Sequence, residues 1–207
     1  VAHLAELVEG PGVGRQRRTR GRQAGLERSH PCHGPIQLGA GPLERELNLS
    51  QLVRTQPQLQ LELLDVAEQG VAKGRELARA SGVEIETRVA DVTRFDLGIE
   101  RWDAIVSIFL HLPSKARREL HRRAIAALAP GGVFVYEAYG PGQLRYRTGG
   151  PPEPQLLHSR DDGVSDFDGC AVEHAFEGVR AVNEGRLHRG DGFVVQVIAR
   201  KRLGSEP

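Results

Sequence analysis

The chain has 207 residues, enough for one domain with a complete hydrophobic core, and a formal net charge of +1. That charge gives no overall field toward nucleic acid or a membrane surface, and no apolar run reaches the roughly 20 residues that a spanning helix needs. Only Cys32 and Cys170 are present, which excludes a disulfide framework and a four-cysteine zinc site. "VAHLAELVEG" lacks the features of a signal peptide, so we expect a reduced, cytoplasmic protein.

Residues 1–64 differ in composition from the rest of the chain. They contain no Asp, Lys or aromatic residue, and the first aromatic residue is Phe95. "GVGRQRRTRGRQAGLERSH" has almost no apolar content, so residues 1–34 are predicted to be disordered. An RNA-binding arm is the alternative for this Arg/Gly run, but no aromatic residue is interleaved to stack on bases. We therefore expect no nucleic-acid partner, and one domain over residues 35–203.

From Pro35 onward, strand and helix patterns alternate. The order begins with a strand in "PIQLGAG" (35–41), a helix in "PLERELNLSQLVRT" (42–55) and an alternating strand in "QLQLELLD" (58–65). A helix follows in "AEQGVAKGRELARASG" (67–82), where Gly82 is a C-terminal stop, and then a strand in "VEIETRVAD" (83–91).

The second half begins with "WDAIVSIFL" (102–110), a nearly continuous apolar run typical of a central strand covered on both faces. A helix over 113–132, ended by Pro130 and Gly131, precedes strands at 133–140, 171–181 and 192–202. This order predicts an α/β fold, a Rossmann-like doubly wound αβα sandwich. Its sheet would be mostly parallel and seven-stranded with an antiparallel last strand, and ligands would bind beyond the carboxyl ends of the strands.

Three segments carry a family resemblance: "VADVTRFDLGIERWDAIVSIFLHLP", "LAPGGVFVYEAYGPGQLRYRTGGPP" and "EGRLHRGDGFVVQVIARK". With them, about residues 64–202 resemble class I S-adenosylmethionine-dependent methyltransferases, and more narrowly the small bacterial methyltransferases of the tellurite-resistance type. The resemblance implies S-adenosylmethionine as cofactor and methyl transfer to a small molecule or metalloid oxyanion.

The resemblance also implies a donor site. Asp65 would accept hydrogen bonds from ribose hydroxyls, which an acid at a strand end does in related folds; the alternative is a helix-capping Asp. Asp91 would receive the adenine amino group, and the alternative is a turn Asp. The remaining expected donor contacts are Val66, Val92, Ser107, Ile108, Phe109, Gly39 and Gly41. For Phe109 plain core packing is an equal alternative.

On the acceptor side the resemblance points to Tyr139, His188 and Arg189. Arg189 would hold an anionic acceptor and His188 would move a proton near neutral pH, while "YRTGGPPEP" would cover the site. A polar hairpin turn at 188–190 and an edge aromatic with a solvated hydroxyl at Tyr139 are the alternatives. His111 is either a pocket residue or a loop histidine. No metal site is expected, since the histidines lack ligand spacing.

The first glycine loop departs from the family pattern. "LGAGPLERE" offers Gly39 and Gly41, but Leu43 stands at the third glycine position and Pro42 removes a backbone donor. Three interpretations stay open: a degenerate but working donor loop, a catalytically impaired binding domain, and a wrong reading frame over residues 1–64. A nicotinamide-dependent oxidoreductase is disfavoured, because the tail has no Tyr-x-x-x-Lys pair. Oligomeric state is not readable.

Overall fold

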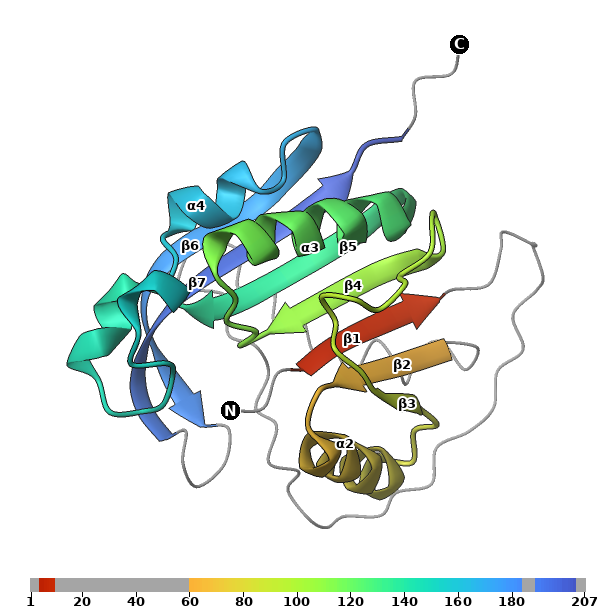
Figure 1. The fold of residues 1–207 in the computed structure, drawn as a ribbon, viewed down its shortest axis with the longest axis horizontal. Coiled ribbons are helices and arrows are strands. Elements are labelled where there is room, and N and C mark those ends of the chain that lie inside the picture. Colours follow the sequence, from red (N-terminus) through yellow and green to blue (C-terminus); the bar gives the residue numbers. More distant parts are fainter. Residues whose placement is uncertain (1–3, 10–59, 184–188, 204–207) are drawn as a thin grey trace, which may run out of the picture.

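A computed structural model describes residues 4–9, 60–183 and 189–203 (Figure 1). Within these ranges, seven strands form one sheet in the order β3-β2-β1-β4-β5-β7-β6. The strands are β1 (Leu4–Glu9), β2 (Gln60–Asp65), β3 (Glu86–Val89), β4 (Trp102–Ile108), β5 (Leu128–Tyr139), β6 (Cys170–Asn183) and β7 (Arg189–Lys201). The helices are α2 (Glu68–Ser81), α3 (Ser114–Ala127) and α4 (Arg160–Ser165), with single 3₁₀ turns η1 (Pro141–Arg145) and η2 (Pro154–Leu156).

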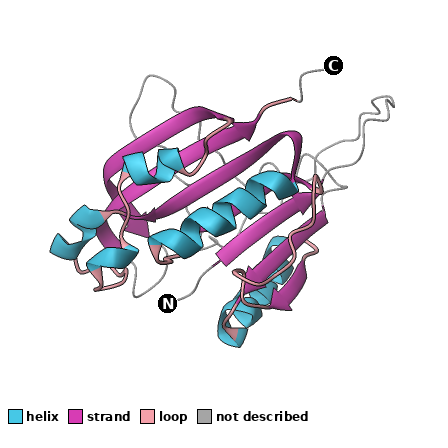
Figure 2. Cartoon of the chain, turned by 45° about the horizontal axis from the view of Figure 1, so that its top comes forward, coloured by secondary structure: helices cyan, strands magenta, loops and turns pink. Residues whose placement is uncertain are grey.

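Helices cover both faces of the sheet, as predicted for an α/β sandwich. Neighbouring residues of a strand point to opposite faces. Leu64 belongs to the main core cluster together with Leu120 and Ala124 of α3, whereas Leu63 packs beside Gly74 of α2. Figures 1 and 2 show α3 and α4 over one side of the sheet and α2 at the β2–β3 end.

The sheet is mixed rather than mostly parallel. β2 pairs with β3 and β4 pairs with β5 in parallel, while β7 runs antiparallel to both β5 and β6, as expected for the last strand. β1 runs antiparallel between β2 and β4, with Ala5 opposite both Leu64 and Ser107.

The place of the first strand therefore differs from the prediction. Leu4–Glu9 forms a strand inside the stretch 1–34 that was predicted to be disordered. The backbone N–H and C=O groups on the facing sides of β2 and β4 need hydrogen-bond partners, and this short segment supplies them. The expected strand at 35–41, the helix at 42–55 and the domain boundary at residue 35 lie outside the described residues, so they stay predictions.

Two element boundaries also need correction. α3 ends at Ala127, before Pro130 and Gly131, and β5 begins directly at Leu128. The Leu128 N–H still reaches the Ala124 carbonyl, and Gly131 then adopts a positive φ of 79° within the strand. β3 is limited to Glu86–Val89. The end of α2 was predicted correctly: Gly82 caps it with a left-handed φ of 67°.

A buried ionic cluster joins α3 to α4. Arg117 donates through Nε to Asp166 Oδ2 at 2.6 Å and through Nη2 to Oδ1 at 3.1 Å, and His121 Nδ1 lies 2.8 Å from the same Oδ2. All three side chains are at most 2% exposed. Burial would raise the pKa of Asp166, but the hydrogen bonds from His121 and Arg117 hold it below its usual value. This cluster fixes α4, which follows the loop over residues 146–158, onto the core.

Candidate functional site

The carboxyl ends of β2 and β3 border a cleft of about 230 Å³. Because parallel strands end at the same edge of a sheet, residues 26 positions apart in sequence meet here. The cleft is lined by Leu64, Asp65, Val66, Ala90, Asp91, Val92, Thr93, Leu110 and Leu112. Four residues expected at the donor site thus lie together: Asp65, Val66, Asp91 and Val92.

Asp65 presents a buried carboxylate to this edge. Asp65 is 2% exposed, and its Oδ1 accepts a hydrogen bond from the Ala67 N–H at 2.8 Å. Oδ2 has no partner among the described residues. An unpaired buried acceptor is costly, so this oxygen suits a hydroxyl donor of a bound molecule. The helix-capping alternative is met only in part, since the N-cap of α2 is Ala67 and has no side-chain cap.

Asp91 forms a local turn at the mouth of the same cleft. Its Oδ1 accepts from the Thr93 N–H at 2.9 Å and from Thr93 Oγ1 at 2.6 Å, and Oδ2 lies 3.8 Å from Arg94 Nε. The Thr93 hydroxyl, then the Thr93 amide and Arg94, lower the pKa of this carboxyl. Asp91 is therefore ionised at neutral pH and held in a fixed orientation, with half of its side chain exposed.

The next expected contacts follow along β4. Ser107 is 3% exposed, and its Oγ has no partner among the described residues. Ile108 is half-buried. Phe109 directly follows the strand with a φ of 51°, in the left-handed region that a bulky residue rarely adopts. Its N–H donates to the Glu137 carbonyl at 2.7 Å, so the structure around it holds this conformation.

Tyr139 lies at the end of β5 beside these residues. Its ring stacks on Phe109 with centroids 4.5 Å apart and on His111 at 5.7 Å. The residue is 1% exposed, and its hydroxyl donates to the Thr148 carbonyl at 3.0 Å. The alternative of an edge aromatic with a solvated hydroxyl is therefore wrong, since the hydroxyl is buried and engaged with the main chain.

The remaining expected residues are placed differently. Arg189 is exposed at the start of β7, opposite Asn183 of β6 in the ladder. His188, Gly39 and Gly41 lie outside the described residues. The structure therefore brings together on one cleft four of the nine residues expected at the donor site. It also shows the strand that carries Arg189 next to the loop after β5.

The polar residues of that loop were not singled out from the sequence. Gln143 is 2% exposed and Thr148 is 9% exposed; both bond to the backbone around them. The sequence does hold one signal for this loop: Thr148 precedes two glycines, Gly149 and Gly150, and both adopt a positive φ.

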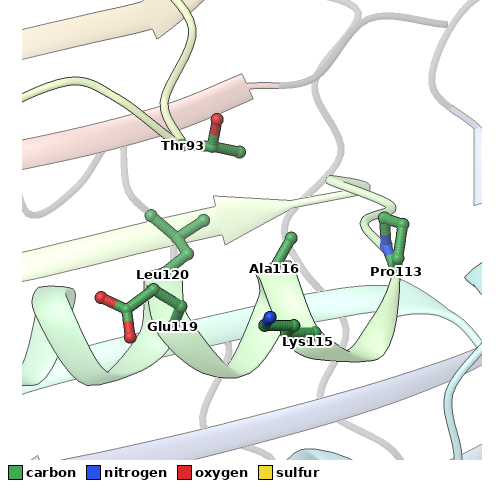
Figure 3. Close-up of a pocket in the computed structure, with 6 residues that line it drawn as sticks. All are labelled: Thr93, Pro113, Lys115, Ala116, Glu119 and Leu120. Carbon is green, nitrogen blue, oxygen red and sulfur yellow. The ribbon is translucent and has the colours of Figure 1, made fainter.

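A second hollow of about 370 Å³ lies beside the first and shares Thr93 with it. Figure 3 shows Lys115, Ala116, Glu119 and Leu120 on α3, with Pro113 before the helix and Thr93 opposite. None of the site residues expected from the sequence lines it. Within the described ranges, no group of three His, Cys, Asp or Glu residues is arranged to hold a metal ion, and no helix is long and apolar enough to cross a bilayer.

Comparison with known proteins gives a family match over the central part of the chain. Residues 37–132 match the family described as "methyltransferase domain". No curated protein matches the sequence.

Several solved structures share the fold. One comes from work on the conversion of a disulfide bond into a thioacetal group during echinomycin biosynthesis; it is 21% identical, with a TM-score of 0.57 over 79% of this chain and 72% of that chain. A SAM-dependent methyltransferase from Methanosarcina mazei is 15% identical, with a TM-score of 0.50 over 68% and 81%. TehB from Haemophilus influenzae is 17% identical, with a TM-score of 0.52 over 67% of this chain and 49% of that chain.

Proposed function

We propose that this chain, of which residues 37–132 match a methyltransferase domain, is a class I S-adenosylmethionine-dependent methyltransferase. In this proposal it transfers a methyl group from S-adenosylmethionine to a small-molecule or metalloid oxyanion acceptor. The observation that carries this proposal is the pair of carboxylates, Asp65 and Asp91, on one cleft at the ends of two parallel strands. Their chemistry suits a nucleoside, which offers ribose hydroxyls and an exocyclic amine as donors.

In this proposal Asp65 and Asp91 have separate roles. Oδ2 of Asp65 accepts from the ribose hydroxyls, because Oδ1 is already held by Ala67. Asp91, fixed by Thr93 on one oxygen, receives the adenine amino group, while Val92 and Val66 line the cleft beside it. Leu110 and Leu112 supply apolar surface for the base. Ser107, Ile108 and Phe109 border the donor on the β4 side, and Gly39 and Gly41 would approach its methionine end.

The acceptor side needs positioning more than acid–base chemistry. When bound, the sulfonium donor supplies a methyl group that is already activated, so the chain has to align the acceptor with it. We assign the exposed guanidinium of Arg189 to hold an anionic acceptor, His188 to move a proton and Tyr139 to shape the site. The fold shared with TehB, a protein of the tellurite-resistance type, supports an oxyanion among the candidate acceptors.

A catalytically impaired binding domain is the second candidate. It is favoured by one observation: β1 lies in the middle of the sheet and runs antiparallel to both of its neighbours. The proposed donor loop would instead need a parallel strand at this place in the sheet. The sequence around Gly39 and Gly41 also lacks the third glycine.

Titration calorimetry with S-adenosylhomocysteine tests the proposal, with NADH as the control ligand. Saturable binding of S-adenosylhomocysteine alone is expected. Asp65→Asn should weaken it about tenfold or more, because a charge-assisted hydrogen bond is lost. Asp161→Asn, an equal change at an exposed carboxylate of α4, should leave it unchanged. A folded chain that binds neither ligand would reject the donor site and favour the impaired domain.

A further inference from the structure

The segment after β5 returns to the sheet through a set of hydrogen bonds that the donor site does not use. β5 ends at Tyr139, η1 follows, and residues 146–150 then turn back toward the start of β7. We call residues 146–150 the strap. Arg147 in the strap and Arg145 before it are exposed, whereas Thr148 is buried.

The backbone of Tyr139 is itself anchored by a hydrogen bond to His111. Its N–H donates to Nε2 of His111 at 3.1 Å, so this nitrogen of His111 acts as the acceptor and carries no proton. The two residues that flank His111 in sequence, Leu110 and Leu112, line the cleft beside Asp65. The backbone of Tyr139 is thereby fixed relative to the wall of that cleft.

Three side chains then fasten the strap. Tyr139 Oη donates to the Thr148 carbonyl at 3.0 Å. Gln143 Nε2 donates to Thr148 Oγ1 at 3.0 Å and to the Gly149 carbonyl at 2.9 Å, and its Oε1 accepts from the Phe193 N–H at 2.7 Å. Thr148 Oγ1 donates in turn to the Asp191 carbonyl at 2.8 Å. Every polar atom of the Gln143 amide and the Thr148 hydroxyl is thus used to join the strap to β7.

Close packing shows that the strap fits this position. A Cβ at Gly150 would lie 2.8 Å from Cδ2 of the Tyr139 ring, and one at Gly192 would lie 3.2 Å from its Cε1. A Cβ at Gly190 would lie 3.1 Å from Cγ2 of Thr148. At Gly150 the backbone approaches the Tyr139 ring more closely than a residue with a Cβ allows, and at Gly190 and Gly192 the packing is tight. Gly190 directly follows Arg189.

We propose that Tyr139, Gln143 and Thr148 form a clamp that positions the strap against the turn end of the β6–β7 hairpin, next to Arg189. Tyr139 is then a positioning residue and not one that exchanges a proton with the acceptor. The importance of the clamp for activity rests on the proposed function, since the turn end of the hairpin, which carries Arg189, is the assigned acceptor side. The clamp itself is a property of the folded chain and is tested without turnover.

Site-resolved tryptic cleavage of the native full-length chain measures opening of the strap. Cleavage after Arg145 and Arg147 is followed by mass spectrometry, against cleavage elsewhere in the chain. Tyr139→Phe removes one hydrogen bond of the clamp and Thr148→Val removes two. Each change should speed cleavage at these two sites about three- to tenfold. Thr148→Ser keeps the hydroxyl and should restore the wild-type rate.

Tyr136→Phe is the matched control, because the buried Tyr136 hydroxyl has no partner among the described residues. It should leave cleavage at Arg145 and Arg147 unchanged. An unchanged rate in Tyr139→Phe and Thr148→Val, or an equal rise at every arginine, would overturn the clamp. Titration of the same variants with S-adenosylhomocysteine separates the two proposals: absent binding in the wild type rejects the proposed function, while the cleavage rates still decide the clamp.

Discussion

Gly70 in the first turn of α2 leaves room for the Asp65 carboxylate, so Gly70→Ala is a direct way to disturb the proposed donor site. A Cβ at this position would lie 1.9 Å from Asp65 Oδ2 and 2.6 Å from its Cγ. No pair of non-bonded atoms tolerates that separation. Only two residues connect β2 to α2, so the helix has little freedom to move away. We expect the carboxylate to rotate away and to lose its hydrogen bond with the Ala67 N–H.

The magnitude follows from two opposed terms. Gly→Ala within a helix stabilises it by up to about 1 kcal/mol. A hydrogen bond to a buried charged group contributes about 1.5–3 kcal/mol. The net change in the free energy of unfolding should be a loss of about 1–2 kcal/mol, together with weaker binding of S-adenosylhomocysteine.

A double-mutant cycle in urea isolates the clash. In an Asp65→Ala background no carboxylate meets the new methyl group, so Gly70→Ala should then stabilise the protein by about 0.5–1 kcal/mol. The sign of the Gly70→Ala effect thus reverses between the two backgrounds. An equal destabilisation in both would refute the reasoning, because the methyl group would then be clashing with something other than Asp65.

Three further predictions concern the core. Asp166→Ala should destabilise the protein by about 3–5 kcal/mol in urea titrations, since it leaves the buried Arg117 charge uncompensated, whereas Arg122→Ala at an exposed pair should cause no measurable change. Burial lowers the pKa of His121 below 6.5 in spite of the bond to Asp166, so the unfolded chain takes up a proton that the native chain does not. Thermal melts should therefore show stability falling as pH drops below about 6.5, by at most about 1.4 kcal/mol per pH unit from this group, and His121→Gln should flatten the slope; an unaltered slope would exclude His121 as its source. Tyr136→Phe should keep or raise the melting temperature, as it removes a buried hydroxyl that has no partner among the described residues, and a clear loss of stability would contradict this.

Much of the fold follows from local sequence patterns. The apolar run of β4 and the alternation in β2 are strong signals, and Gly82 marks the end of α2 as its left-handed φ requires. The meeting of Asp65 and Asp91 follows once their two strands are taken as parallel neighbours. These features depend on short-range periodicity and on one general property of parallel sheets.

Other features depend on partners that are distant in sequence. Arg117 and His121 read as part of the basic face of α3, yet both are buried because Asp166 arrives from α4, 45 to 49 residues later. Gln143 likewise meets the Phe193 amide across 50 residues. Polar side chains carry no periodic signal for such contacts. The strand at Leu4–Glu9 was missed because six residues beside a polar, glycine-rich stretch give too little alternation to outweigh its composition.

The hairpin that ends the sheet also bears on how copies of the protein meet one another. Within the described residues β6 pairs only with β7, and a free edge of 14 residues is long enough to recruit a strand from a second molecule. Its register shifts between Val172 and His174, Glu173 is charged there, and Arg180 turns inward to an ion pair with Glu137. A bulge, an exposed charge and an inward charge each oppose edge-to-edge pairing of β6 with a strand of a second molecule.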